Sequence, residues 1–126
     1  MRAKEVEWGH VRIEIRIANP VQRDQGIVVP DALVATGATW TTVPRQLADD
    51  LALDIVGQYR VRTAAAPQVL DQSYAYIELQ GKALVSFVLV SDTYPSVLLG
   101  VTTLEGMGFA ADPDKERLID SELLLL

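Results

Sequence analysis

Cysteine is absent from this sequence of 126 residues, and histidine occurs once, as His10. The lack of cysteine excludes disulfides, thiolate metal ligands and cysteine nucleophiles. A single histidine argues against a histidine metal cluster and against a Ser-His-Asp triad within one chain. The common metal-based and nucleophile-based hydrolytic sites are therefore poor candidates.

Positive charge and long apolar runs are also scarce. The chain has 11 Lys and Arg against 17 Asp and Glu, a net charge of −6. Nucleic acids and anionic membranes are poor partners for such a chain, since phosphate contacts require clustered basic residues. The apolar run 83–90 is too short to span a bilayer, and residues 1–10 are too charged for a signal peptide. We expect a cytoplasmic protein with no membrane span.

The remaining composition predicts one folded domain over residues 1–126. Apolar residues make up 49% of the chain, enough for a core. Residues 11–17 alternate apolar and charged side chains, which predicts a half-buried strand, and residues 27–34 predict a second strand that forms a hairpin with it. Pro30 has no amide hydrogen and indicates an edge or a bulge.

A short helix is predicted over residues 44–52, with Thr42 as its N-cap and Pro44 near its first position. Further strands follow. Residues 59–79 read as a long hairpin with small residues at its tip, residues 80–82 as a tight turn, and residues 83–90 as a strand buried on both faces. Short strands at 97–100, 109–111 and 117–119 flank a helical turn at 101–106. The pattern predicts a mainly β barrel or sandwich.

Two motifs occur in a characteristic order. The first is Ala-Leu-Val-Ala-Thr-Gly-Ala-Thr at 32–39, followed by Thr42-Val43-Pro44; the second is Val-Leu-Leu-Gly at 97–100, followed by Leu104-Glu105 and Gly108-Phe109. Together they resemble the retropepsin-like aspartic proteases, and Asn19-Pro20 resembles the bacterial branch. The likeness covers about residues 9–120. It implies a closed acid-protease barrel with one or two short helices, active as a symmetric homodimer.

The resemblance implies a mechanism that needs no metal or organic cofactor. A water held between two aspartates attacks a peptide bond of a peptide or protein substrate. Two carboxylates so close share a proton, so that one acts as general base and the other as general acid. The chain has one such loop, so the pair requires two chains related by a two-fold axis. Asp92-Thr93-Tyr94 lacks the glycine and the apolar lead-in, and we interpret it as a plain turn.

Position 35 departs from the family. The family has Asp there and this chain has Ala35, whose methyl group neither accepts nor donates a proton. We predict that the chain as given has no useful peptidase activity. Two explanations remain open: a replacement of the catalytic aspartate made by engineering, and a natural pseudoprotease that retains the fold and its peptide groove.

The likeness also assigns site residues. Position 35 is the catalytic position, and Thr36 and Gly37 fix the loop around it. Residues 59–79 correspond to the flap that covers substrate. The substrate-binding residues are expected to be Ala38, Thr63, Ala64, Ala65, Ala66, Leu98, Leu99 and Gly100.

Some alternatives stay open at this point. Trp40 is a candidate for lining the substrate pocket or for packing in the core or interface. The apolar tail 123–126 is either an interface strand or the remnant of a longer chain. The competing functional class is a non-catalytic dimeric peptide-binding or scaffolding domain on the same fold. A third is an unrelated small β barrel, which would not bring two copies of loop 35–38 together.

Overall fold

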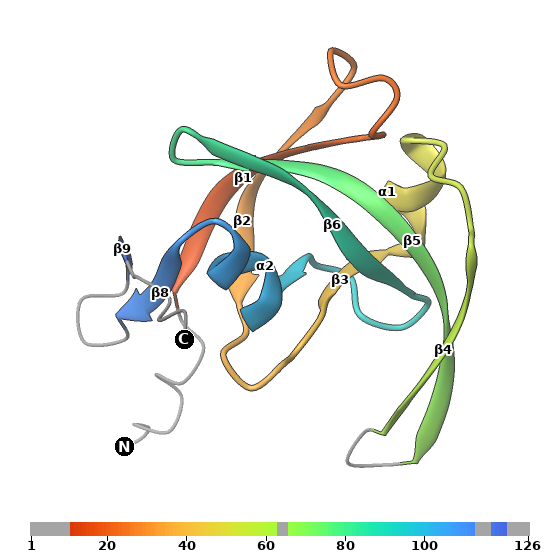
Figure 1. Cartoon of the computed structure of the whole chain (residues 1–126). Helices are drawn as coiled ribbons and strands as arrows, with labels where there is room; N and C mark the ends of the chain where they lie inside the picture. Colours follow the sequence, from red (N-terminus) through yellow and green to blue (C-terminus); the bar gives the residue numbers. More distant parts are fainter. Residues whose placement is uncertain (1–10, 63–65, 113–116, 121–126) are drawn as a thin grey trace, which may run out of the picture.

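The computed structural model describes residues 11–62, 66–112 and 117–120. These residues form nine strands and two short helices, which follow β3 and β7 (Figure 1). Their bounds are β1 (Arg12–Ala18), β2 (Ile27–Val34), β3 (Thr41–Pro44), α1 (Arg45–Asp50), β4 (Gly57–Arg62), β5 (Pro67–Leu79), β6 (Lys82–Ser91), β7 (Leu98–Leu99), α2 (Val101–Gly106), β8 (Phe109–Asp112) and β9 (Arg117–Asp120).

Seven of the strands form one sheet that closes on itself. The order is β1-β2-β7-β3-β6-β5-β4, and β1 also pairs with β5, which closes a barrel and leaves β4 as the outer strand. Strands β8 and β9 form a separate two-stranded sheet. The sequence prediction of a mainly β closed barrel with short helices is therefore confirmed. Its centre is filled by fully buried aliphatic side chains that include Ile15, Ile17, Val34, Ile77 and Leu99.

The first hairpin matches its prediction closely. Strands β1 and β2 pair antiparallel, with a register shift between the pairs Ile13↔Ala32 and Ile15↔Val29. Pro30 lies inside this shift, where a residue without an amide hydrogen costs the ladder nothing. The bulge thus accommodates the proline, as the sequence indicated.

The turn between β5 and β6 is equally local in origin. Gln80 and Gly81 both have positive φ, at 48° and 81°. Two successive residues with positive φ are characteristic of the type I′ turn that joins antiparallel strands of normal twist. Strand β6 then differs from its prediction. Its second half, Val88–Ser91, is buried, but Val85 is 44% exposed, because this first half pairs only with β5.

The start of α1 corrects a second prediction. Thr42 is not the N-cap; it lies in β3, whose residues Thr41–Pro44 pair parallel with Val88–Ser91. The N-cap is Pro44, and no side chain caps the helix. Pairing with β6 recruits Thr42 into the sheet, so a helix signal that is valid locally is overridden by a strand far away in sequence.

Strand β7 lies between β2 and β3 and positions the loop that follows β2. It pairs parallel with β2 and antiparallel with β3. The chain from β2 to β3 must therefore cross the end of β7, and residues 35–40 make that crossing. In Figure 1 this loop and the far end of the β4–β5 hairpin lie at the same lower end of the barrel.

Candidate functional site

Loop 35–38 is a tight turn fixed by backbone hydrogen bonds. The Ala38 amide donates to the Ala35 carbonyl at 2.9 Å, which closes the turn, and the Ala35 amide donates to the Leu99 carbonyl at 2.9 Å. Thr36 and Gly37 are exposed at its tip, whereas Ala35 is half-buried. The turn therefore holds position 35 through its backbone alone. The side chain of this residue takes no part in these hydrogen bonds.

The start of α2 holds the loop from its other end. The Val101 amide donates to the Ala38 carbonyl at 2.9 Å, and the Thr102 amide donates to the Thr39 carbonyl at 3.1 Å. The Thr102 hydroxyl donates to the same Thr39 carbonyl at 2.7 Å. The two sequence motifs thus meet in space, and the second one supplies partners for the backbone of the first.

Gly100 is the point of closest approach between the two motifs. A Cβ on this residue would lie 2.4 Å from the backbone carbon of Trp40 and 2.8 Å from the carbonyl oxygen of Thr39. Real side chains do not tolerate such distances to backbone. The glycine of the second motif is therefore required by the crossing of the loop over the end of β7.

A buried chain of hydroxyl groups lies under the crossing. At one end, the Gly100 amide donates to Thr41 Oγ1 at 2.9 Å. In the middle, Thr103 Oγ1 lies 2.6 Å from Thr41 Oγ1 and 2.8 Å from Ser86 Oγ. At the other end, Ser86 Oγ donates to the Phe87 carbonyl at 3.0 Å. Since the first and last donors are fixed, each hydroxyl donates to the next one along. Every buried hydroxyl has a donor and an acceptor, as stable interiors require.

Removal of the middle hydroxyl tests this chain. We expect Thr103→Val to lower the free energy of unfolding by about 1–3 kcal/mol, because it leaves the Thr41 hydroxyl without an acceptor and Ser86 without a donor. The control Thr103→Ser keeps the hydroxyl and loses one methyl group, for about 1 kcal/mol. Urea unfolding measures both. A Thr103→Val variant as stable as the parent chain would show that the hydroxyl chain contributes nothing.

A cleft of about 410 Å³ separates the loop from the β4–β5 hairpin. The loop forms one wall, and the hairpin and β6 form the other. Its lining residues are Gly37, Ala38, Thr39, Trp40, Thr42, Val61, Arg62, Leu70 and Leu89. This described lining contains no Asp or Glu, so nothing in the cleft replaces the carboxylate that position 35 lacks.

Trp40 both lines the cleft and packs against its wall. Its ring lies edge-to-face with Phe87 at 4.6 Å and with Tyr59 at 6.1 Å between ring centroids, and Tyr59 lies 5.8 Å from Phe87. Such pairs add about 0.5–1.5 kcal/mol each beyond burial. The two readings of Trp40 from the sequence are thus combined: it is a cleft residue held by aromatic packing.

The predicted site residues divide into three groups. Ala35, Thr36, Gly37 and Ala38 form the turn, and Ala38 lines the cleft. Leu98 is half-buried, but Leu99 is fully buried and Gly100 is buried. Leu99 and Gly100 support the loop from below, and their contact with a substrate stays a prediction. Thr63, Ala64 and Ala65 lie outside the described residues, and Ala66 is exposed.

The cleft wall was missed by sequence reasoning. Val61, Leu70 and Leu89 come from three neighbouring strands and meet on one face: Tyr59 pairs with Leu70, and Gln72 pairs with Leu89. The signal was present in the alternation of these strands. What the alternation does not reveal is which face turns toward the loop.

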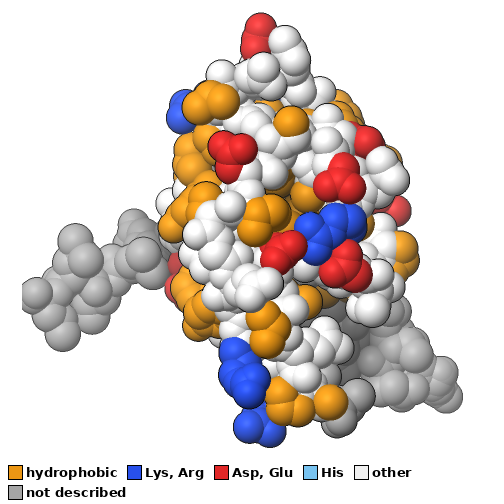
Figure 2. Space-filling model, turned by 90° about the vertical axis from the view of Figure 1, so that its right-hand side faces the viewer, with side chains coloured by type: hydrophobic (Ala, Val, Ile, Leu, Met, Phe, Trp, Pro, Cys, Tyr) orange, Lys and Arg blue, Asp and Glu red, His pale blue; other side chains and the backbone are white. Residues whose placement is uncertain are grey.

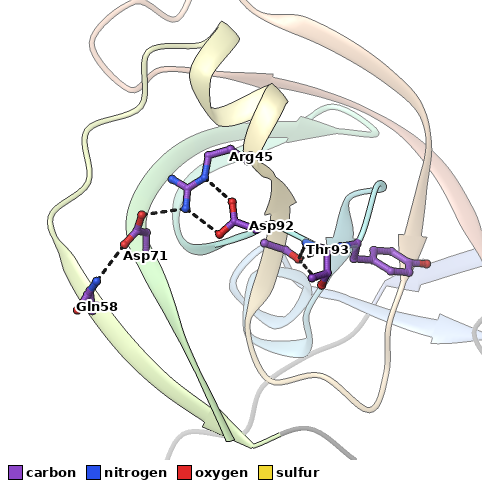
Figure 3. A network of polar contacts seen from close by, with 7 residues as sticks. Arg45, Gln58, Asp71, Asp92 and Thr93 are labelled. Carbon is purple, nitrogen blue, oxygen red and sulfur yellow. Dashed lines mark hydrogen bonds and ion pairs between the residues drawn. The ribbon is translucent and has the colours of Figure 1, made fainter. Parts of the chain in front are cut away.

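A polar network lies at the base of the hairpin (Figure 3). Arg45, at the start of α1, binds Asp92 through two contacts of 2.8 and 3.2 Å. It also forms an ion pair with Asp71 of β5 at 2.9 Å. Gln58 of β4 donates to Asp71 at 3.4 Å. One guanidinium thus connects the helix, the hairpin and the loop 92–96 before β7.

This network predicts a pH dependence of stability. The Arg45 hydrogen bonds hold the pKa of Asp92 below its ordinary value of 3.8, so the native state binds fewer protons than the unfolded chain near that pH. The contribution is complete above about pH 4 and is lost as the pH falls through the lowered pKa. Urea midpoints at pH 3 and 6 should fall less in Asp92→Asn than in the parent chain. An equal fall in both would contradict the assignment.

Two further properties concern the described residues. No group of three or more His, Cys, Asp or Glu side chains suited to a metal ion occurs among residues 11–62, 66–112 and 117–120. Within the same ranges, neither helix has the length and apolarity needed to cross a membrane.

Comparison with solved structures identifies the fold. The simian foamy virus (mac) protease matches with a TM-score of 0.56 and 23% identity, over 75% of this chain and 91% of that one. The EIAV protease, solved with an inhibitor, matches with a TM-score of 0.58 and 17% identity, over 90% and 91%. A foamy viral protease-reverse transcriptase solved with an RNA/DNA hybrid matches at 0.53 and 13%, over 75% and 12%.

These matches define a retropepsin-like aspartic protease fold. At such low identity they establish the architecture and not the activity. No protein-family model and no curated protein matches the sequence. The matched proteins are viral, and the bacterial affinity indicated by the sequence stays a prediction.

Proposed function

We propose that this chain is the protomer of a homodimeric aspartic endopeptidase that is inactive in this form because residue 35 is Ala. One observation carries the proposal. Position 35 begins a turn held by the Leu99 carbonyl on one side and closed by Ala38 on the other, and Gly37 and Ala38 of this turn line the cleft of about 410 Å³. A methyl group does not need such a fixed position, whereas a catalytic carboxylate does.

The mechanism follows from that position. With Asp at position 35 in both protomers, two carboxylates share a proton across the two-fold axis. The ionised one draws a proton from the bound water, which attacks the peptide carbonyl, and the protonated one donates to the carbonyl oxygen. Thr36 and Gly37 form the tip of the turn, and the β4–β5 hairpin covers the substrate.

The state of Gly37 supports a partner at the turn. A Cβ on Gly37 would meet no atom within 4 Å inside the protomer, and the backbone there has no positive φ. The fold of one chain therefore does not require glycine at this position. A second copy of the same loop, approaching closely, gives a physical reason for it.

A second candidate is a dimeric peptide-binding module without catalysis. Its support is that the cleft and the hydrogen bonds around the turn are complete although the carboxylate is missing. An extended peptide binds such a cleft through main-chain pairing and apolar pockets, neither of which needs position 35. A cytoplasmic location is proposed for either function.

Ala35→Asp separates the two candidates. An endopeptidase gains cleavage of unstructured peptides that an inhibitor mimicking the transition state blocks. A binding module dimerises and binds peptides in both forms and cleaves none. A protein that stays monomeric and binds no peptide, with or without the substitution, is neither.

A further inference from the structure

Two arginines on the outer strand of the hairpin have no side-chain partner among the residues that the structure describes. Five other basic side chains are engaged: Arg12 with the Asp31 carbonyl, Arg16 with Glu78, Arg23 with the Pro20 carbonyl and the Tyr76 ring, Arg45 with Asp71 and Asp92, and Lys82 with Asp120. Arg60 and Arg62 are exposed. Through their side chains they make no hydrogen bond or ion pair within residues 11–62, 66–112 and 117–120.

Both arginines lie on the same face of the hairpin. They are alternate residues of β4, and they pair with Val69 and Pro67 of β5. Val69 is 54% exposed, so an apolar surface lies beside the two charges. The lower end of Figure 2 shows basic side chains next to hydrophobic ones, apart from the acidic groups further up. In a chain of net charge −6 this is a local reversal of sign.

Arg62 adjoins the cleft, and both arginines belong to an open strand edge. Val61, which lies between the two arginines, lines the cleft, and so does Arg62. Strand β4 is the outer strand of the sheet and has no neighbour on its other side among the described strands. An extended chain leaving the cleft past β4 would therefore find unpaired backbone groups and two guanidinium groups together.

We propose that Arg60 and Arg62 form an exosite for acidic residues that flank the peptide segment bound in the cleft. This inference rests on the proposed function, since it assigns a substrate class to the same cleft. A guanidinium group suits a carboxylate because it donates two parallel hydrogen bonds to it. A nucleic acid is the weaker candidate, because two cations on an acidic protein neutralise too few phosphates.

Selection from a random dodecapeptide library on the chain as it stands tests the exosite without requiring catalysis. Asp and Glu should be enriched on one side of the apolar core of the selected peptides. A selected peptide should bind about three- to tenfold more tightly than its copy with Asn and Gln in place of Asp and Glu. This ratio, measured by fluorescence anisotropy, should shrink at high salt.

In the double variant Arg60→Gln/Arg62→Gln, the acidic peptide and its neutral copy should bind equally well. The charge-matched control Arg12→Gln/Arg23→Gln should retain the preference for the acidic peptide. Urea midpoints and the two single variants establish that the loss is not one of folding. Peptides selected without acidic bias, or a ratio that survives in the double variant, overturn the exosite alone. An oligothymidylate that competes better than the acidic peptide also overturns it. Selection of no peptide at all overturns the proposed function together with the exosite.

Discussion

Ala35→Asp should convert the chain into a peptidase. We expect hydrolysis of a mixed peptide substrate at about pH 5 to rise at least about 10²-fold above that of the parent chain, since one general acid or base contributes about 10²–10⁴-fold. This pH is mildly acidic, which suits a carboxylate pair that shares one proton. It also lies above the range in which the Arg45–Asp92 contact weakens. Mass spectrometry of the products measures the rate and the cleavage sites.

Ala35→Asn is the matched control. It has nearly the shape of aspartate but neither takes up nor releases a proton, so it should stay as inactive as the parent chain. If two protomers form the site, the specific activity of Ala35→Asp should rise with protein concentration until the dimer is saturated. A folded dimeric Ala35→Asp variant that binds peptides and cleaves none would refute the endopeptidase and leave the binding module.

Gly100→Ala should cause the largest loss of stability of any single methyl addition that we propose. The added Cβ would lie 2.4 Å from backbone carbon and 2.6 Å from the carbonyl oxygen of Trp40. Neither atom belongs to a flexible side chain, so the loop or the end of β7 must shift. Overpacking typically costs about 1–3 kcal/mol and occasionally more. We expect the upper end of this range or beyond, measured by urea unfolding.

Gly37→Ala provides the comparison. It adds the same methyl group three residues before Trp40, where no atom lies within 4 Å, so the protomer should lose less than about 1 kcal/mol. In a dimer with facing loops the same variant should weaken association, measured by sedimentation. If Gly100→Ala is as stable as Gly37→Ala, the loop does not cross β7 as described.

The sequence predicted the turn and its frame because both depend on local rules. Alternation located β1 and β2, and Pro30 marked the bulge between them. The small residues at 36–38 indicated a tight turn, and residues 97–100 indicated a short strand. These features are set by residue types whose conformational preferences act within a few positions.

The side-chain contacts that support the loop could not be predicted from such local rules. Thr41 and Thr103 are 62 residues apart, and nothing in either neighbourhood shows that one hydroxyl will accept from the other. Asp92 was interpreted as a plain turn residue, yet it binds Arg45, which is 47 residues away in sequence and lies beside it where the paired strands β3 and β6 end. Thr42 had the features of a helix cap until pairing with β6 placed it in a strand. In each case the deciding partner is distant in sequence.

The burial of Leu99 was not predicted either. A motif shared with a family identifies residues near a site, but it does not tell which of them reach the surface. Leu99 is fully buried and contributes its carbonyl to the Ala35 amide. Trp40, which no motif assigned, lines the cleft.

Residue 35 enters the described hydrogen bonds through its main chain alone. The backbone at position 35 therefore stabilises the fold, whereas its side chain would determine the reactivity. A change of one base turns an aspartate codon into an alanine codon. Such a change would remove catalysis and leave the fold unchanged. The reverse change is just as short, so the proposed gain of activity in Ala35→Asp requires a change of one base in the gene.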